Sequence, residues 1–150
     1  MTWNLARCGA AAALLLAGCA ADSGAPQPAP QAPTAATAAA PVGEPVPGAE
    51  MQALTRGNSM RGTTPAGASF TIHVRPDGTQ RIHLVSRGTV MTDSGRVFLV
   101  DGATCNVWNT LRNGQRQCPE VRREGETFRS YEGGTLLSTF TIVPGNPDRL

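Results

Sequence analysis

From residue 58 to residue 143, short apolar segments alternate with turns that contain glycine. Val, Ile, Thr and Phe favour strands, whereas Gly, Pro, Asn and Asp favour tight turns. Short strands that recur every roughly 8 to 12 residues are typical of a β-sandwich or a β-barrel. The strands that this pattern predicts are residues 58–63, 69–75, 79–86, 95–100, 103–109, 118–124, 127–131 and 135–143.

No helical segment long enough to connect parallel strands interrupts this series, so consecutive strands should pair in an antiparallel manner. Closing about eight strands into a barrel removes exposed edges and encloses either side chains or one small ligand. The predicted fold class is therefore all-β, an antiparallel meander of about eight strands in a small lipocalin-like barrel. Residues 49–57 allow a short N-terminal helix, with Met51 and Leu54 on one side and Gly57 as its end.

The sequence also predicts the register of a first hairpin. A three-residue turn at residues 76–78 sets Ile72 opposite Ile82 and Phe70 opposite Leu84, so that these apolar side chains share one face. The opposite face should be solvated. It carries Thr71, His73, Arg75, Arg81 and His83.

A second turn, at Glu124-Gly125, sets Val121 opposite Phe128 and Glu120 opposite Arg129. The apolar pair would then point inward and the charged pair outward. The interior that the pattern predicts consists of Phe70, Ile72, Val74, Ile82, Leu84, Val121, Phe128, Phe140 and Ile142. This core is thin for a domain of about 100 residues, and a disulfide would therefore add needed stability.

The first nineteen residues have the organisation of a secretion signal. One positive residue precedes a run of ten small or apolar residues, which is shorter than the about 20 that a membrane-spanning helix needs. The segment Leu16-Ala17-Gly18-Cys19 resembles the lipobox of bacterial lipoproteins. The resemblance implies that residues 1–18 are a lipoprotein signal peptide and that Cys19 carries a diacylglyceryl and acyl anchor.

Residues 19–48 are rich in Ala and Pro, which predicts a disordered tether ahead of a β-barrel domain at residues 49–150. In bacterial lipoproteins an Asp after the lipidated Cys favours inner-membrane retention, and this chain has Ala20 there. The resemblance thus implies an outer-membrane anchor facing the periplasm, with the cell surface as an alternative. The membrane is the first expected partner. A soluble periplasmic protein with an ordinary signal peptide is the other interpretation.

Of the four cysteines, Cys8 would leave with the signal peptide and Cys19 would take the lipid. Cys105 and Cys118 then remain as a pair in an oxidising compartment, which predicts a disulfide. A zinc site would need about four ligands, and neither a His nor a second Cys pair lies at zinc spacing from these two residues.

The stretch CNVWNTLRNGQRQC contains two signals that conflict. A hairpin centred on Asn113-Gly114 would leave Cys105 roughly 13 Å out of register with Cys118, beyond the limit of about 7 Å for bonded cysteines. We therefore expect the strand to end near Trp108. Residues 109–117 should form an irregular loop that the disulfide closes.

All thirteen basic side chains are Arg. The absence of Lys excludes Schiff-base chemistry, Ser-Lys dyads and P-loops. A formal net charge of +2 is too small to predict nucleic-acid binding. The segment GNSMRG lacks the glycine spacing of a nucleophile elbow. No catalytic residues and no cofactor are expected, and the chain is therefore predicted not to be an enzyme.

The charged residues of the second hairpin alternate in sign, which indicates a salt-bridged surface and not an acid-base pair. They are Glu120, Glu124, Glu126 and Glu132 with Arg122, Arg123 and Arg129. His73 and His83 lie diagonally on one predicted face and could approach a common ion, but no third ligand accompanies them. We expect solvated surface histidines and no metal site.

Trp108 is either the largest side chain of the core or an exposed anchor for a partner, and the thin core favours the first interpretation. With Arg112 and Arg116 it forms the candidate partner contact. Arg122 and Arg123 could extend this group into a site for a carboxylate or a polyanion, although ordinary surface arginines explain the same pattern.

Five short motifs together resemble small disulfide-bonded β-domains of unknown function on bacterial envelope proteins. They are GNS at residues 57–59, the PDG turn, C-x-x-W with a second Cys, GETFR and the closing PGNP at residues 144–147. The plan of anchor, spacer and small barrel is also similar to outer-membrane lipoproteins whose eight-stranded barrel inhibits proteases. The inhibitors' own signature residues have no counterpart here.

Two functions follow as expectations. The first is a non-enzymatic, outer-membrane-anchored module, inhibitor-like or otherwise, that binds an envelope protein or glycan. The alternative is a lipocalin-like carrier of a small apolar ligand. A barrel filled by its own side chains would exclude the carrier.

Overall fold

The computed structural model describes residues 40–150. The predicted signal peptide, the lipobox with Cys19 and most of the predicted tether lie outside the described residues. The described chain forms one helix, α1, one 3-10 helix, η1, and nine strands. The bounds are β1 Glu44–Pro45, α1 Gly48–Thr55, β2 Ser59–Thr63, β3 Ser69–Val74, β4 Thr79–Ser86, β5 Thr89–Val100, β6 Ala103–Trp108, η1 Leu111–Gly114, β7 Glu120–Glu124, β8 Thr127–Glu132 and β9 Thr135–Val143.

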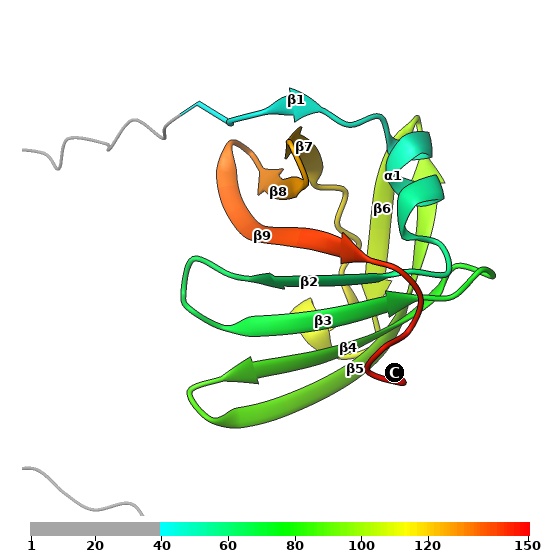
Figure 1. Cartoon of the computed structure of the whole chain (residues 1–150), viewed down its shortest axis with the longest axis vertical. Helices are drawn as coiled ribbons and strands as arrows, with labels where there is room; N and C mark the ends of the chain where they lie inside the picture. The colour runs from blue at the N-terminus through cyan, green and yellow to red at the C-terminus, as the bar shows by residue number, and fades with distance from the viewer. Residues whose placement is uncertain (1–39) are drawn as a thin grey trace, which may run out of the picture. The chain divides into compact units, whose positions relative to one another are not determined.

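All nine strands belong to one antiparallel sheet with the order β1-β7-β8-β9-β2-β3-β4-β5-β6. The sheet curls strongly, with α1 beside β6 (Figure 1). From β2 to β9, consecutive strands pair with each other except at the step from β6 to β7, and β2 also pairs with the last strand, β9. This confirms the predicted all-β antiparallel meander.

The ladder is interrupted between β6 and β7, which are consecutive in the sequence. A single bridge between Asn106 and Gln117 connects β6 to the segment before β7. The disulfide between Cys105 and Cys118 lies directly beside this bridge. We call this junction, residues 105–106 with residues 117–118, the seam. The closure that a meander barrel needs is therefore made by one bridge and one covalent bond at this point.

The first hairpin has the predicted register, because Ile72 pairs with Ile82 and Phe70 pairs with Leu84. The predicted register of the second hairpin is wrong by two residues. Val121 pairs with Ser130 and not with Phe128, since the turn is formed by Gly125 and Glu126. A shift by an even number of residues keeps the same side chains inward, so Val121 and Phe128 are still buried. The predicted pairing of Glu120 with Arg129 is likewise replaced, because Glu120 pairs with Tyr131.

Two strands differ from the expected ranges. β5 begins at Thr89 instead of residue 95, because β4 pairs along its whole length with residues 89–96 although few of these are apolar. β1 lies inside the range predicted as tether, and Val46 N–H donates to Val121 O at 2.8 Å. The folded part therefore begins before residue 49.

The core lies on the inner face of the curled sheet. Its buried cluster consists of Met51, Phe70, Ile82, Trp108, Val121, Phe128 and Phe140. Ile72, Leu84 and Ile142 are partly buried against this cluster, and Val74 is fully buried. The predicted interior residues thus all lie in or against the core. The rings of Phe128 and Phe140 stack with their centroids 5.5 Å apart, which strengthens the contact between β8 and β9.

Candidate binding cavity

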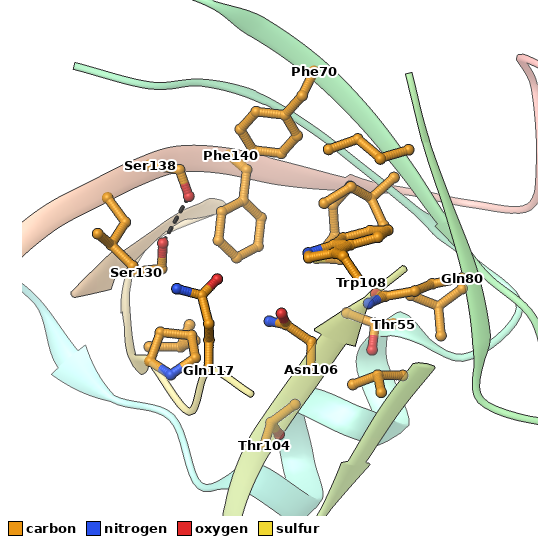
Figure 2. Close-up of a pocket in the computed structure, with 18 of the residues that line it drawn as sticks. Thr55, Phe70, Gln80, Thr104, Asn106, Trp108, Gln117, Ser130, Ser138 and Phe140 are labelled. Carbon is orange, nitrogen blue, oxygen red and sulfur yellow. Dashed lines mark hydrogen bonds between the residues drawn. The ribbon is translucent and has the colours of Figure 1, made fainter. Parts of the chain in front are cut away.

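Side chains from α1 and from every strand between β2 and β9 line a cavity of about 280 Å³ inside the curled sheet (Figure 2). The lining follows from strand alternation, because residues two apart along a strand point to the same face. Phe70, Ile72 and Val74 of β3 show this pattern, and α1 adds Met51 and Thr55. The interior is consequently not filled by its own side chains.

The size of this cavity sets the scale of a ligand. Small-molecule sites usually measure about 300–1,000 Å³, and an apolar cavity of about 150 Å³ already binds benzene. At about 280 Å³ the interior has room for a molecule of roughly two to three aromatic rings. Most of its lining is aliphatic or aromatic, which favours an apolar ligand body.

Most polar residues of the lining already have hydrogen-bond partners within the protein. Ser130 and Ser138 bond to each other at 2.7 Å, and Thr104 Oγ1 donates to Gly48 O at 2.7 Å. Thr55 Oγ1 donates to Met51 O at 2.9 Å, and Gln80 Nε2 donates to Arg96 O at 3.4 Å. These contacts fix the lining and leave those groups less available to a ligand.

Asn106 is the exception. Its Oδ1 is buried and accepts no hydrogen bond, and it is the only such side-chain atom in residues 40–150. The side chains of Asn106 and Gln117 lie next to each other in the lining of the cavity (Figure 2). An unpaired buried acceptor costs about 1–3 kcal/mol. This cost makes Asn106 the position where a ligand would gain most from supplying a donor.

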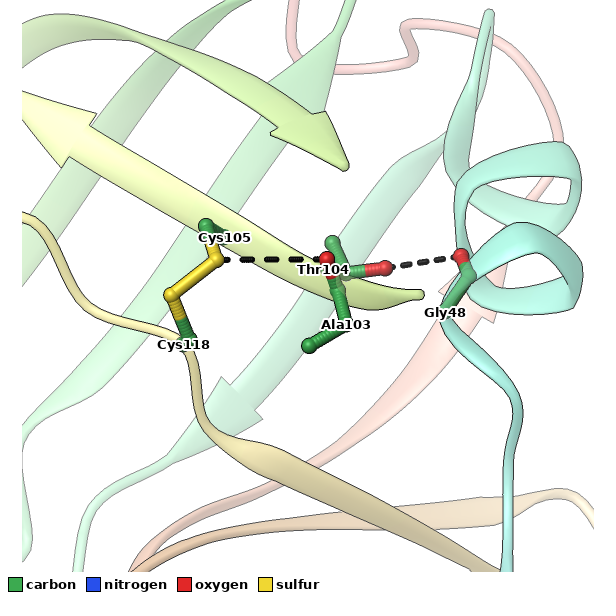
Figure 3. Close-up of a disulfide and its surroundings, with 5 residues drawn as sticks. All are labelled: Gly48, Ala103, Thr104, Cys105 and Cys118. Carbon is green, nitrogen blue, oxygen red and sulfur yellow. Dashed lines mark hydrogen bonds between the residues drawn. A yellow bond between two sulfur atoms is a disulfide. The ribbon is translucent and has the colours of Figure 1, made fainter. Parts of the chain in front are cut away.

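The seam holds these two residues in place. Asn106 N–H donates to Gln117 O at 2.7 Å, and Gln117 N–H donates to Asn106 O at 2.9 Å. The adjacent cysteines have Cα atoms 4.0 Å apart, so the predicted disulfide is formed (Figure 3). The hydrogen bond from Thr104 Oγ1 to Gly48 O connects the same strand to the start of α1 (Figure 3). The cavity wall at β6 is therefore fixed on both sides.

The loop that the disulfide closes has the expected form. β6 ends at Trp108, and residues 109–117 contain only the short η1 with Arg112 and Asn113 at positive φ. The carboxylate of Asp93 accepts from Thr110 N–H at 2.9 Å and from Leu111 N–H at 2.8 Å. Burial alone would raise the pKa of Asp93, but the backbone donors Leu111, Thr110 and Ser94 together outweigh it and lower the pKa.

The candidate partner contact is divided between the interior and the surface. Trp108 is 7 % exposed and lines the cavity, so it belongs to the core and offers no exposed anchor. Arg112 Nη1 lies 3.1 Å from Glu132 Oε2, and both side chains are about half exposed. Arg116 is exposed. The three residues therefore form no common contact surface.

The other arginines of the predicted anion site pair with carboxylates. Arg122 Nε lies 2.7 Å from Glu120, and Arg123 lies 3.7 Å from Glu50 of α1. Arg129 pairs with Glu124. The hydrogen bond that Arg129 donates to the carboxylate of Glu124 raises the pKa of Arg129. This agrees with the interpretation of a salt-bridged surface.

The prediction of a solvated His73 is wrong, because its side chain is 7 % exposed. Its Nδ1 lies 3.1 Å from Asn58 O and 3.3 Å from Ser59 Oγ, and Ser59 Oγ also donates to Gly145 O, after β9, at 2.8 Å. His83 is half-buried and pairs with Thr71 on the neighbouring strand. No group of three or more His, Cys, Asp or Glu within residues 40–150 is placed to hold a metal ion.

Neither Asn106 nor Gln117 is among the site residues that the sequence pattern predicts. The signal was present, because Thr104, Asn106 and Trp108 alternate along one strand and a core position for Trp108 puts the other two inward.

None of the helices within residues 40–150 is long and apolar enough to span a bilayer. Searches with this chain find no matching family model, no matching curated protein and no matching solved structure.

Proposed function

We propose that the folded domain binds one small, largely apolar molecule inside the curled sheet, on a chain that Cys19 anchors to the outer membrane. The supporting observation is the cavity of about 280 Å³ lined by α1 and strands β2 to β9. A barrel with only a structural role would be expected to fill this space, since voids in cores destabilise proteins. The alternative function of a small-ligand carrier is thereby favoured over a protein-binding module.

A role in binding a protein or glycan at the surface has less support. Its expected anchor, Trp108, is buried, and Arg112 is paired with Glu132. Aromatic and Arg side chains contribute most to such interfaces when a partner can reach them. We therefore place the binding site in the interior and assign no catalytic step to it.

A fluorescence titration with N-phenyl-1-naphthylamine, a neutral dye that brightens in apolar surroundings, tests this function. The chain carries Cys19→Ser, so that neither lipid nor detergent takes up the dye. We expect saturable binding of one dye per chain. Binding that rises linearly with dye concentration, without saturation, would contradict an interior site.

Two neighbouring residues on opposite faces of β4 provide a matched pair of variants. Leu84 lines the cavity, whereas Val85 does not. Leu84→Phe should weaken dye binding at least about tenfold, which corresponds to about 1.4 kcal/mol, because the larger side chain occupies the site. Val85→Phe should leave the affinity within about twofold. Equal effects of the two variants would place the dye outside the cavity.

Labelling cells with radioactive palmitate tests the lipid anchor separately from the binding site. We expect the label on the wild-type chain and on Cys8→Ser, and its loss in Cys19→Ser, since the lipobox ends at Cys19. Label that persists in Cys19→Ser would contradict the proposed anchor while leaving the interior binding site untouched.

A further inference from the structure

We infer that the ligand is an uncharged amphiphile whose polar group carries an N–H donor, and that this donor binds Asn106 Oδ1. The inference rests on the proposed function and specifies the class of molecule that the same cavity takes. Asn106 Oδ1 is the one buried side-chain polar atom of residues 40–150 that lacks a hydrogen bond. A ligand with a donor group at this position would supply the hydrogen bond that the described residues do not.

The charges around the cavity determine that the ligand is neutral. Arg112 is the only charged residue of the lining. Its side chain is 45 % exposed and pairs with Glu132 at 3.1 Å. An ionised group deep in the cavity would therefore meet no free opposite charge, and burying it unpaired costs several kcal/mol. A ligand with a carboxylate or a protonated amino group at the seam therefore does not fit this lining.

The position of Asn106 determines where the polar group of the ligand lies. Its backbone is held by the two hydrogen bonds to Gln117 and by the neighbouring disulfide, so the side chain is presented from the most constrained part of β6. Because Oδ1 is buried in the free protein, the amide turns toward the donor when the ligand binds, on a backbone that stays fixed and so loses little conformational entropy. The ligand accordingly has its N–H group at the seam. Its apolar body lies against the aromatic side of the cavity, where Trp108, Phe70 and Phe140 meet.

Two dyes of nearly equal shape test this inference. N-phenyl-1-naphthylamine has one N–H, and 1-phenoxynaphthalene has an ether oxygen in the same place. Competition titrations with the Cys19→Ser chain should show the amine binding about five- to tenfold more tightly, as expected for one hydrogen bond that relieves a buried unpaired acceptor. Equal affinities would overturn the inference and leave the proposed function standing. Failure of both dyes to bind would overturn both.

Asn106→Leu, which has a similar shape and no acceptor, assigns the effect to this residue. We expect the preference for the amine to fall to about one, and the urea midpoint of the free protein to rise because the unpaired acceptor is gone. A preference that survives in Asn106→Leu would overturn the assignment. Asn106→Ala, which cannot overpack the site, should abolish the preference in the same way if the leucine variant does not fold. Asn109→Leu is the matched control, because it makes the same change at an exposed residue outside the lining, and it should keep the preference.

Discussion

Asn106 and Gln117 are joined by two backbone hydrogen bonds, of 2.7 and 2.9 Å, which form the single β-bridge between β6 and the segment before β7. Every other neighbouring pair among β2 to β9 shares a ladder of several residues, with one register shift in the pairing of β8 and β9 at Ser130 and Tyr131. Because one bridge supplies few contacts, the covalent bond between Cys105 and Cys118 takes over much of the closure. The stability of the domain and the shape of its cavity are therefore coupled at this seam.

Removing the disulfide should destabilise the domain and loosen the cavity. Cys105→Ala combined with Cys118→Ala should lower the free energy of unfolding by about 3 kcal/mol, as expected for a closed loop of this length. Urea denaturation measures the loss. As a control, the wild-type protein with its disulfide reduced should have the same urea midpoint as the double variant. If reduction leaves the midpoint of the wild-type protein unchanged, the bridge alone closes the seam.

Gly95 gives space to the indole of Trp108, with which it pairs between β5 and β6. A Cβ at this position would lie 2.1 Å from Val107 O and 3.0 Å from Trp108 Cε3. Gly95→Ala should therefore lower the free energy of unfolding by about 1–3 kcal/mol, the usual cost of overpacking. Gly88 is a suitable control, because its surroundings are open, and Asn tolerates its φ of 77°. Gly88→Asn should change stability by less than about 0.5 kcal/mol in the same thermal or urea unfolding experiment.

Asn58 connects the end of α1 to the C-terminal segment. Its Nδ2 donates to Leu54 O at 2.8 Å, and its Oδ1 accepts from Gly145 N–H at 3.0 Å. Asn58→Ala should cost about 1–3 kcal/mol, because both partners lose a hydrogen bond at a half-buried position. Hydrogen exchange at the Gly145 amide should accelerate.

Asn146→Ala is the control for Asn58→Ala, since the side chain of Asn146 bonds only to Leu150 at the chain end. We expect a much smaller loss of stability there. Equal losses in the two variants would mean that the C-terminal segment as a whole, and not Asn58, makes the connection.

The lowered pKa of Asp93 predicts a dependence of stability on acid. Its folded pKa lies below its ordinary value because the backbone N–H groups of Leu111, Thr110 and Ser94 outweigh the effect of its burial. The ionised carboxylate therefore stabilises the fold above the unfolded pKa of about 3.9. This contribution is lost as the pH falls from there through the folded pKa. Asp93→Ala should cost about 0.5–2 kcal/mol at pH 7, as for other caps.

Urea unfolding of wild type, Asp93→Ala and Asp93→Asn between pH 7 and pH 2 measures this effect. The difference between wild type and Asp93→Ala should shrink below about pH 4, where the unfolded carboxyl becomes protonated. Asp93→Asn keeps an acceptor that does not titrate and should lose less stability at pH 7. A difference that stays constant down to pH 2 would contradict the role of the carboxylate.

Local chemistry accounts for the parts of the fold that the sequence predicts. The Pro76-Asp77-Gly78 turn determines the first hairpin, and alternation along β3 and β4 identifies the inward side chains. Prediction failed where several turns were compatible with one segment, as at Glu124. It also failed at His73, whose partner Ser59 on the adjacent strand bonds to Gly145, a contact between residues far apart in the sequence.

The sequence by itself determined the all-β class, the interior side chains of the hairpins and the pair of cysteines that remain to form a disulfide. Only the tertiary structure decided where the meander is interrupted, and that Asn106 carries an unpaired acceptor beside an interior space of about 280 Å³. The physical reason is that the volume of a cavity equals the volume that the sheet encloses minus the volume of the side chains that point inward. A sequence reveals the inward side chains, whereas the curl and closure of the whole sheet determine the enclosed volume.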